Sequence, residues 1–130
     1  MNDFKKTLQI LNNGSKKDKI KVLGLLSQST NPEIINKIIT KLDDSEIEVR
    51  GEAFSSLLIN KNDISKFLIN ALSSENKNIK AFSALVLANR GDTNSIPLLE
   101  LLSKEPSSMV RDCALGALEY LRTNKFNKEI

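Results

Sequence analysis

The stretch LDDSEIEVRGEAFSSL, Leu42–Leu57, decides the expected fold because its pattern recurs along the chain. Val49 is followed by basic Arg50, by small Ala53 four positions on and by Leu57 eight positions on, which is one face of an amphipathic helix. The same order of residue types returns about thirty residues away on either side. The other matching sets are Ile20, Lys21, Gly24 and Gln28, where Gln28 breaks the pattern; Ile79, Lys80, Ser83 and Leu87; and Val110, Arg111, Ala114 and Leu118. Repetition at this period predicts a stack of helix pairs.

A second apolar series predicts another helix before each of these inner helices. Leu8, Ile38, Leu68 and Leu98 follow one another at intervals of thirty. The expected outer helices cover roughly 3–12, 32–42, 63–73 and 94–103, and the inner helices roughly 16–29, 46–60, 76–89 and 107–122. Pro32 and Pro97 belong in first turns of helices, and Gly91 is expected to stop a helix in a left-handed conformation.

Composition argues for a soluble helical domain without catalytic machinery. The chain of 130 residues has 40% hydrophobic but only 5% aromatic residues and no Trp, a mixture that suits helix-on-helix packing. It contains no His, which excludes His-dependent triads and imidazole metal sites. Its one Cys, Cys113, is interpreted as a packed thiol. We expect no enzyme activity, no cofactor and no metal.

The expected compartment is the cytoplasm. The N-terminal segment lacks the apolar core of a signal peptide, and no apolar run approaches the roughly 18 residues of a membrane span. An acidic cluster, Asp43, Asp44, Glu46, Glu48 and Glu52, is interpreted as a solvated helix start, since a calcium loop needs six or more converging oxygens.

Charge is unevenly spread along the chain. Net charge is +3, made up of +4 in residues 1–30, −3 in 31–60, +3 in 61–90 and −1 in 91–130. This alternation differs from the continuous basic stripe that a nucleic-acid backbone favours. The Lys-rich first repeat, with Lys16, Lys17, Lys19 and Lys21, nevertheless keeps nucleic-acid binding as an alternative.

Two segments carry a family resemblance. Leu42–Leu57 and the run RGDTNSIPLLELLSKEPSSMVRDCALGALEYL, Arg90–Leu121, resemble short HEAT-like repeats of the phycobilisome-lyase type. The resemblance implies an all-α fold, an α-solenoid of four HEAT-like helix pairs, about eight helices, in a right-handed superhelix. Residues 1–130 would form a single domain with repeats at about 1–30, 31–60, 61–90 and 91–122 and a polar tail at 123–130. It also implies a ladder between turn acids and inner-helix arginines, at Asp44–Arg50 and Glu105–Arg111.

Inner-helix positions divide into core and surface columns. The expected core columns are Ile20, Val49, Ile79 and Val110; Gly24, Ala53, Ser83 and Ala114; and Leu25, Phe54, Ala84 and Leu115. The resemblance places four other columns on a concave face: Val22, Gly51, Ala81 and Asp112; Leu23, Glu52, Phe82 and Cys113; Leu26, Ser55, Leu85 and Gly116; and Thr30, Ile59, Asn89 and Tyr120. Many of these are apolar, as in a contact surface. Neighbouring helices could instead cover some of them.

These columns predict a protein-interaction module. The expected partner-binding residues are Phe82, Leu85, Leu26, Leu23, Ile59, Tyr120, Glu52 and Ser55, and the partner is another protein or a second copy of this chain. Nucleic-acid binding through the first repeat is the alternative, and a lyase-like accessory role is a minor one. No membrane partner is expected.

Overall fold

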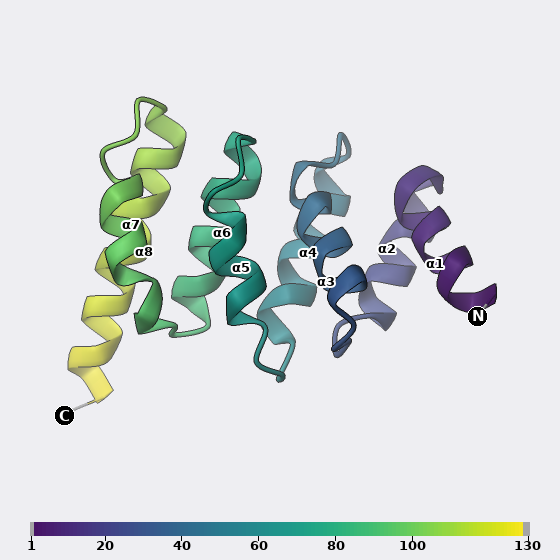
Figure 1. Cartoon of the computed structure of the whole chain (residues 1–130), viewed down its shortest axis with the longest axis horizontal. Coiled ribbons are helices and arrows are strands. Elements are labelled where there is room, and N and C mark those ends of the chain that lie inside the picture. Colours follow the sequence, from purple (N-terminus) through teal and green to yellow (C-terminus); the bar gives the residue numbers. More distant parts are fainter. Residues whose placement is uncertain (1, 129–130) are drawn as a thin grey trace. The chain divides into compact units, whose positions relative to one another are not determined.

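The computed structural model describes the backbone of residues 2–128 and the side chains of residues 3–123. Over this range the chain forms eight α-helices, two short 3-10 helices and no strand (Figure 1). The α-helices are α1 (Asn2–Asn13), α2 (Lys16–Leu25), α3 (Pro32–Thr40), α4 (Ile47–Ile59), α5 (Ser65–Ala71), α6 (Lys77–Asn89), α7 (Ile96–Leu102) and α8 (Ser108–Lys128). The all-α prediction is therefore confirmed.

The chain divides into two compact units, residues 1–67 and 68–130. Helices α1 to α4 belong to the first unit and α6 to α8 to the second, while α5 runs across the division. Each unit is described by itself below, and the superhelix stays a prediction. None of the helices within the described residues has the length and apolar character that crossing a bilayer requires.

Local signals in the sequence set several helix ends. The Asn31 side chain accepts hydrogen bonds from the backbone N–H groups of Glu33 and Ile34, and Pro32 occupies the first position of α3. Gly91 has a φ of 75°, which is the expected left-handed stop after α6. Pro97 lies in the first turn of α7, where its missing N–H costs no helical bond. These expectations are confirmed.

Two helix ends differ from prediction. Helix α2 stops at Leu25 instead of continuing to position 29, because the Gln28 side chain donates to the Ile59 carbonyl and accepts from the Lys61 N–H, both at 2.9 Å. These bonds hold the segment after α2 as a turn. Helix α8 continues to Lys128, so the predicted tail from 123 is wrong over 123–128; no Gly or Pro interrupts that segment. Residues 129–130 lie outside the described residues.

In the first unit α2 packs on α4, and α1 and α3 lie against this pair. The fully buried side chains include Leu11, Leu23, Ile35, Leu42, Val49, Ala53 and Leu57. The buried Ser56 hydroxyl donates to the Leu23 carbonyl and so joins α2 to α4. Each of these helices has an apolar and a polar face, and the apolar faces together form the core of this unit.

In the second unit the most extensive helix pairing is α6 against α8. Small residues are buried on both helices: Ala81, Ala84 and Ala88 on α6, and Ala114 and Ala117 on α8. Alanines spaced three and four residues apart form a flat strip along a helix, which lets two backbones approach closely. Helix α7 packs against α8, and its Leu99 and Leu102 are buried.

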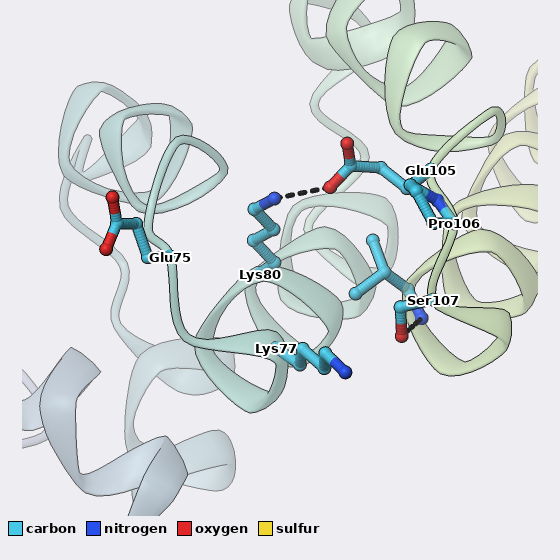
Figure 2. A pocket seen from close by; sticks show the side chains of 7 residues that line it. Glu75, Lys77, Lys80, Glu105, Pro106 and Ser107 are labelled. Carbon is cyan, nitrogen blue, oxygen red and sulfur yellow. Dashed lines mark hydrogen bonds and ion pairs between the residues drawn. The ribbon is translucent and has the colours of Figure 1, made fainter.

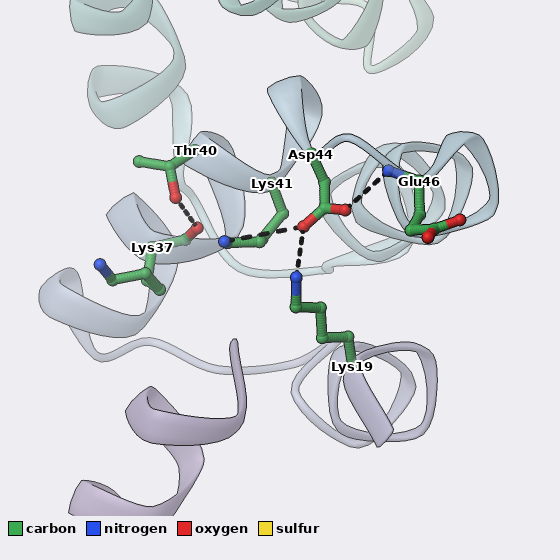
Figure 3. A network of polar contacts seen from close by, with 6 residues as sticks. All are labelled: Lys19, Lys37, Thr40, Lys41, Asp44 and Glu46. Carbon is green, nitrogen blue, oxygen red and sulfur yellow. Dashed lines mark hydrogen bonds and ion pairs between the residues drawn. The ribbon is translucent and has the colours of Figure 1, made fainter. Parts of the chain in front are cut away.

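A buried ion pair joins α2 to the turn before α4 (Figure 3). The Lys19 ammonium lies 2.8 Å from an Asp44 carboxylate oxygen, and the two side chains are only 13% and 4% exposed. Lys41 approaches the same oxygen at 3.8 Å, and the Glu46 N–H donates to the other oxygen. Both oxygens of the Asp44 carboxylate are thus bonded within the fold.

The second unit contains the same arrangement 61 residues further along the sequence, where Lys80 bonds to the Glu105 carboxylate. The predicted pairings Asp44–Arg50 and Glu105–Arg111 are therefore wrong. Arg111 instead donates to the backbone carbonyls of Glu105 and Pro106, and the buried Arg50 Nε has no hydrogen-bond partner within the described residues. Each acid bonds to the lysine 25 residues before it, since that lysine lies on the preceding inner helix.

Ala53 and Ser55 provide a test of the register of α4. Ala53 is fully buried and Ser55 is exposed. Ala53→Leu should lower the free energy of unfolding by about 1–3 kcal/mol through overpacking, whereas Ser55→Ala should change it by less than about 0.5 kcal/mol. Urea unfolding followed by circular dichroism measures both. Equal effects would show that the register is wrong.

Asp44 should make stability sensitive to acid. Burial opposes its ionisation, but the hydrogen bonds from Lys19 and the Glu46 N–H, with the charges of Lys19 and Lys41, outweigh burial and lower the pKa of Asp44. A folded-state pKa below the unfolded value means that the carboxylate stabilises the fold above about pH 4 and loses this contribution as pH falls through the folded pKa. Asp44→Asn should lower the free energy of unfolding by about 2 kcal/mol at neutral pH. The variant should also lose less of its stability than the unmodified protein as the pH falls.

The measurement is urea unfolding of both proteins over a pH series. Glu48→Gln is the matched control, because Glu48 pairs with Lys16 at a fully solvated site and its loss should change little. Parallel pH profiles for Asp44→Asn and the unmodified protein would contradict the assignment.

Candidate interaction face

Helix α6 exposes one narrow apolar strip. From Ala81 to Ala88 every side chain is buried except those of Phe82 and Leu85, which are partly exposed. Asn89 follows at the spacing that keeps it on the same face, and its amide donates to the Leu85 carbonyl at 2.8 Å. The middle of this strip therefore presents only apolar side chains.

Helix α8 repeats this spacing with Cys113, Gly116 and Tyr120. Cys113 is partly buried, Gly116 is exposed and Tyr120 is 43% exposed. Helices α6 and α8 pack against each other, and the two strips occupy matching positions 31 residues apart, so we infer that they share one surface of the second unit. We name it the α6–α8 face and define it by Phe82, Leu85, Asn89, Cys113, Gly116 and Tyr120.

A shallow hollow of about 400 Å³ lies on the α8 part of this face. Gly116, Glu119, Tyr120 and Thr123 line it. A Cβ atom built on Gly116 would meet nothing within 4 Å, so the missing side chain leaves open space beside the Tyr120 ring. A bound side chain of moderate size fits such a hollow.

Acidic side chains edge the face. Asp112 and Glu119 are exposed and lie seven residues apart on α8, hence on one side of it. The arginines of the described part of α8 are engaged elsewhere: Arg111 bonds to backbone carbonyls, and Arg122 lies 3.3 Å from the Glu100 carboxylate of α7. The α8 edge of the face is therefore negative.

Cys113 is poorly suited to nucleophilic chemistry. Burial raises the pKa of its thiol, and the Asp112 carboxylate raises this pKa further. The thiol is therefore protonated at neutral pH, whereas reactive cysteines carry a lowered pKa. Its contribution to the face is that of a small apolar side chain.

A second hollow, of about 290 Å³, lies at the starts of α6 and α8 (Figure 2). The lining residues are Glu75, Lys77, Lys80, Glu105, Pro106, Ser107 and Val110. Lys80 and Glu105 point toward each other across it and are bonded (Figure 2). This hollow is part of the packing between two turns, and its central charges already satisfy each other.

The predicted partner-binding residues belong to both units. Phe82, Leu85 and Tyr120 lie together on the α6–α8 face. In the first unit, Ile59 is 56% exposed and Ser55 is exposed, while Leu26 and Glu52 are partly exposed. Leu23 is fully buried, so its prediction as a contact residue is wrong. Ala81, assigned to the same concave columns, is also fully buried.

The error at Leu23 comes from the register of α2. Ser15 accepts from the Asp18 N–H as Asn76 accepts from the Ile79 N–H, and both caps lie four residues before the lysine of the ion pair. Lys19, not Lys21, therefore corresponds to Lys80. The prediction was two residues out of register on this helix, and the cap at Ser15 was the signal that would have corrected it.

The predicted core column of Leu25, Phe54, Ala84 and Leu115 is wrong for its first and last members. Leu25 is 76% exposed and Leu115 is 51% exposed, although Ala84 in the same column is fully buried. The corrected register matches Leu25 to the buried Val86, so it does not account for the exposure of Leu25, which is the last residue of α2. Leu115 lies on a side of α8 that no helix of its unit covers, because the buried side is taken up by Val110, Ala114, Ala117, Leu118 and Leu121.

Other predicted features have simple environments. Within the described residues, no group of His, Cys, Asp or Glu is arranged to hold a metal ion. In the acidic cluster, Asp44 bonds to Lys19 and Glu48 to Lys16. Of the lysines in the first repeat, Lys17 and Lys21 are exposed, while Lys19 is largely buried.

No protein-family model matches the chain, and no curated protein matches it. The likeness to HEAT-like repeats therefore rests on the sequence pattern alone.

Gly116 allows a stability test of the open hollow. Gly116→Ala should raise the free energy of unfolding by about 0.5–1 kcal/mol, since alanine restricts the unfolded chain and meets no neighbour. Gly14→Ala is the opposite control, because its Cβ would lie 2.6 Å from the Ile10 carbonyl oxygen. Thermal unfolding of both variants measures the difference. A destabilised Gly116→Ala protein would mean that the added methyl group meets a neighbouring atom, which would contradict the open space at Gly116.

Proposed function

We propose that this protein is a non-catalytic interaction module that binds another protein through the α6–α8 face. One observation carries the proposal: the central positions of the face are the apolar, partly exposed Phe82 and Leu85 on a helix whose other middle residues are buried. Exposed apolar surface costs free energy in water, and a partner that covers it removes this cost. The hollow at Gly116 adds a place for an anchoring side chain.

The resemblance to HEAT-like repeats supports the same function. In such an architecture, paired helices form a scaffold and the inner helices offer a contact surface. The chain contains no His, and burial and the Asp112 carboxylate raise the pKa of its one thiol, Cys113, so a His-dependent triad is absent from its chemistry and a cysteine nucleophile is disfavoured. Under this proposal the protein acts by holding a partner, in the cytoplasm, and as a HEAT-like solenoid.

Nucleic-acid binding is the second candidate. Exposed Lys16, Lys17 and Lys21 on α2 favour it, since lysines that neutralise phosphates supply most nonspecific affinity. Against it, Lys16 is already paired with Glu48 at 3.0 Å. Such binding would fall steeply with salt, whereas apolar contacts respond little.

Serine substitutions test the interaction face. Phe82→Ser combined with Leu85→Ser should reduce capture of partner proteins from source lysate at least about tenfold, because a few desolvated side chains carry most interface energy. Leu98→Ser combined with Leu101→Ser is the matched control: both leucines are exposed, but on α7. Quantitative mass spectrometry measures capture, and circular dichroism checks folding.

Gly116→Lys should also reduce capture of partner proteins, since the lysine side chain fills the hollow without removing packed atoms. The proposal is wrong if both face variants retain their partners. It is also wrong if changing Lys16, Lys17 and Lys21 to Gln abolishes binding while the Phe82 and Leu85 variant binds normally.

A further inference from the structure

The shape of the α6–α8 face limits what can bind there. Phe82 to Asn89 and Cys113 to Tyr120 each span seven residues, which is about 10 Å or two helical turns. The backbone in the middle of α6 and α8 is used within the helices, so the face has no row of free donors and acceptors for an extended peptide. A helical segment satisfies its own backbone groups and is therefore the better occupant.

The charges of the face select the kind of helix. Its α8 edge carries the exposed carboxylates of Asp112 and Glu119. The basic side chains on the described parts of α6 and α8 lie elsewhere: Lys80 bonds to Glu105, Lys77 lines the hollow at the helix starts, Arg111 bonds to backbone carbonyls and Arg122 lies against Glu100. A partner with basic residues along one edge is therefore complementary.

We propose that the α6–α8 face binds a basic amphipathic helix. This inference rests on the proposed function and names the chemistry of its partner. Apolar side chains at positions i, i+3 or i+4, and i+7 of the bound helix contact Phe82, Leu85 and Tyr120, and a large one enters the hollow at Gly116. Lys or Arg residues seven positions apart on its edge pair with Asp112 and Glu119, which have the same separation.

Two synthetic peptides test this proposal on the full chain. Each has about 18 residues, long enough to hold a helix, with the same leucine stripe. One carries Lys along a single edge of the stripe, and the other carries Glu at those positions. Fluorescence anisotropy at low salt should show that the Lys peptide binds at least about tenfold more tightly, with a preference that weakens as salt is added.

Charge reversal provides the decisive comparison. Asp112→Lys combined with Glu119→Lys should reverse the preference between the peptides. Glu33→Lys combined with Glu75→Lys makes the same change in net charge at exposed residues that are not part of the α6–α8 face and should leave the preference unchanged. Phe82→Ser combined with Leu85→Ser should weaken binding of both peptides.

Four outcomes would overturn the inference. The first is equal binding of the two peptides, and the second is reversal by the control variant as well. The third is failure of the Lys peptide to bind while the Phe82 and Leu85 variant still loses its lysate partners; the proposed function would then stand and only the partner class would be wrong. Sedimentation must also show no dimer that depends on Asp112 and Glu119, since such a dimer would make a second copy the occupant.

Discussion

The close packing of α6 on α8 is the constraint on which the candidate face depends. Ala81, Ala84 and Ala88 place no bulk between the helices, so the two backbones approach and the larger side chains must lie to one side. Phe82 and Leu85 are the side chains between Ala81 and Ala88 that stay partly exposed, whereas Val86 and Leu87 are buried. Gly116 and Tyr120 occupy the matching positions on α8, 31 residues after Leu85 and Asn89. The apolar face is thus a consequence of how the core is built.

Two ion pairs have a different role, since they hold each turn against the inner helix that precedes it: Lys19–Asp44 is buried, and Lys80–Glu105 is partly buried. Lys19 reaches Asp44 and Lys80 reaches Glu105 over the same separation of 25 residues. A buried pair adds little net stability compared with apolar packing, but its loss leaves a charge without compensation. Such pairs therefore favour one register of the turn over its neighbours. Their burial also explains why these lysines are poor candidates for binding phosphate.

The acidic residues along the α8 edge of the α6–α8 face have two explanations, and the two are compatible. Asp112 and Glu119 on α8 correspond in the sequence repeat to Ala81 and Ala88 on α6, which are buried. Asp112 and Glu119 are exposed, and charged side chains suit positions that none of the described helices covers, because they keep that surface soluble. Both substitutions are acidic, however, and both lie beside an apolar strip. The polarity needed for solubility thus also gives the strip a charge preference.

The sequence by itself determined the helices and most of their ends. Proline, glycine and asparagine act on their own backbone or on the next few residues, so Asn31, Pro32, Gly91 and Pro97 could be interpreted locally. The period of about thirty residues also placed Phe82, Leu85 and Tyr120 in matching positions. Only the tertiary structure decided which of these positions are open, because exposure depends on what a neighbouring helix covers: Leu23 is buried, Leu25 and Leu115 are exposed, and Ala81 lies inside the unit. The partners of Asp44 and Glu105 were likewise beyond local pattern, since a lysine on another helix competes with an arginine six residues away and the distance in space decides.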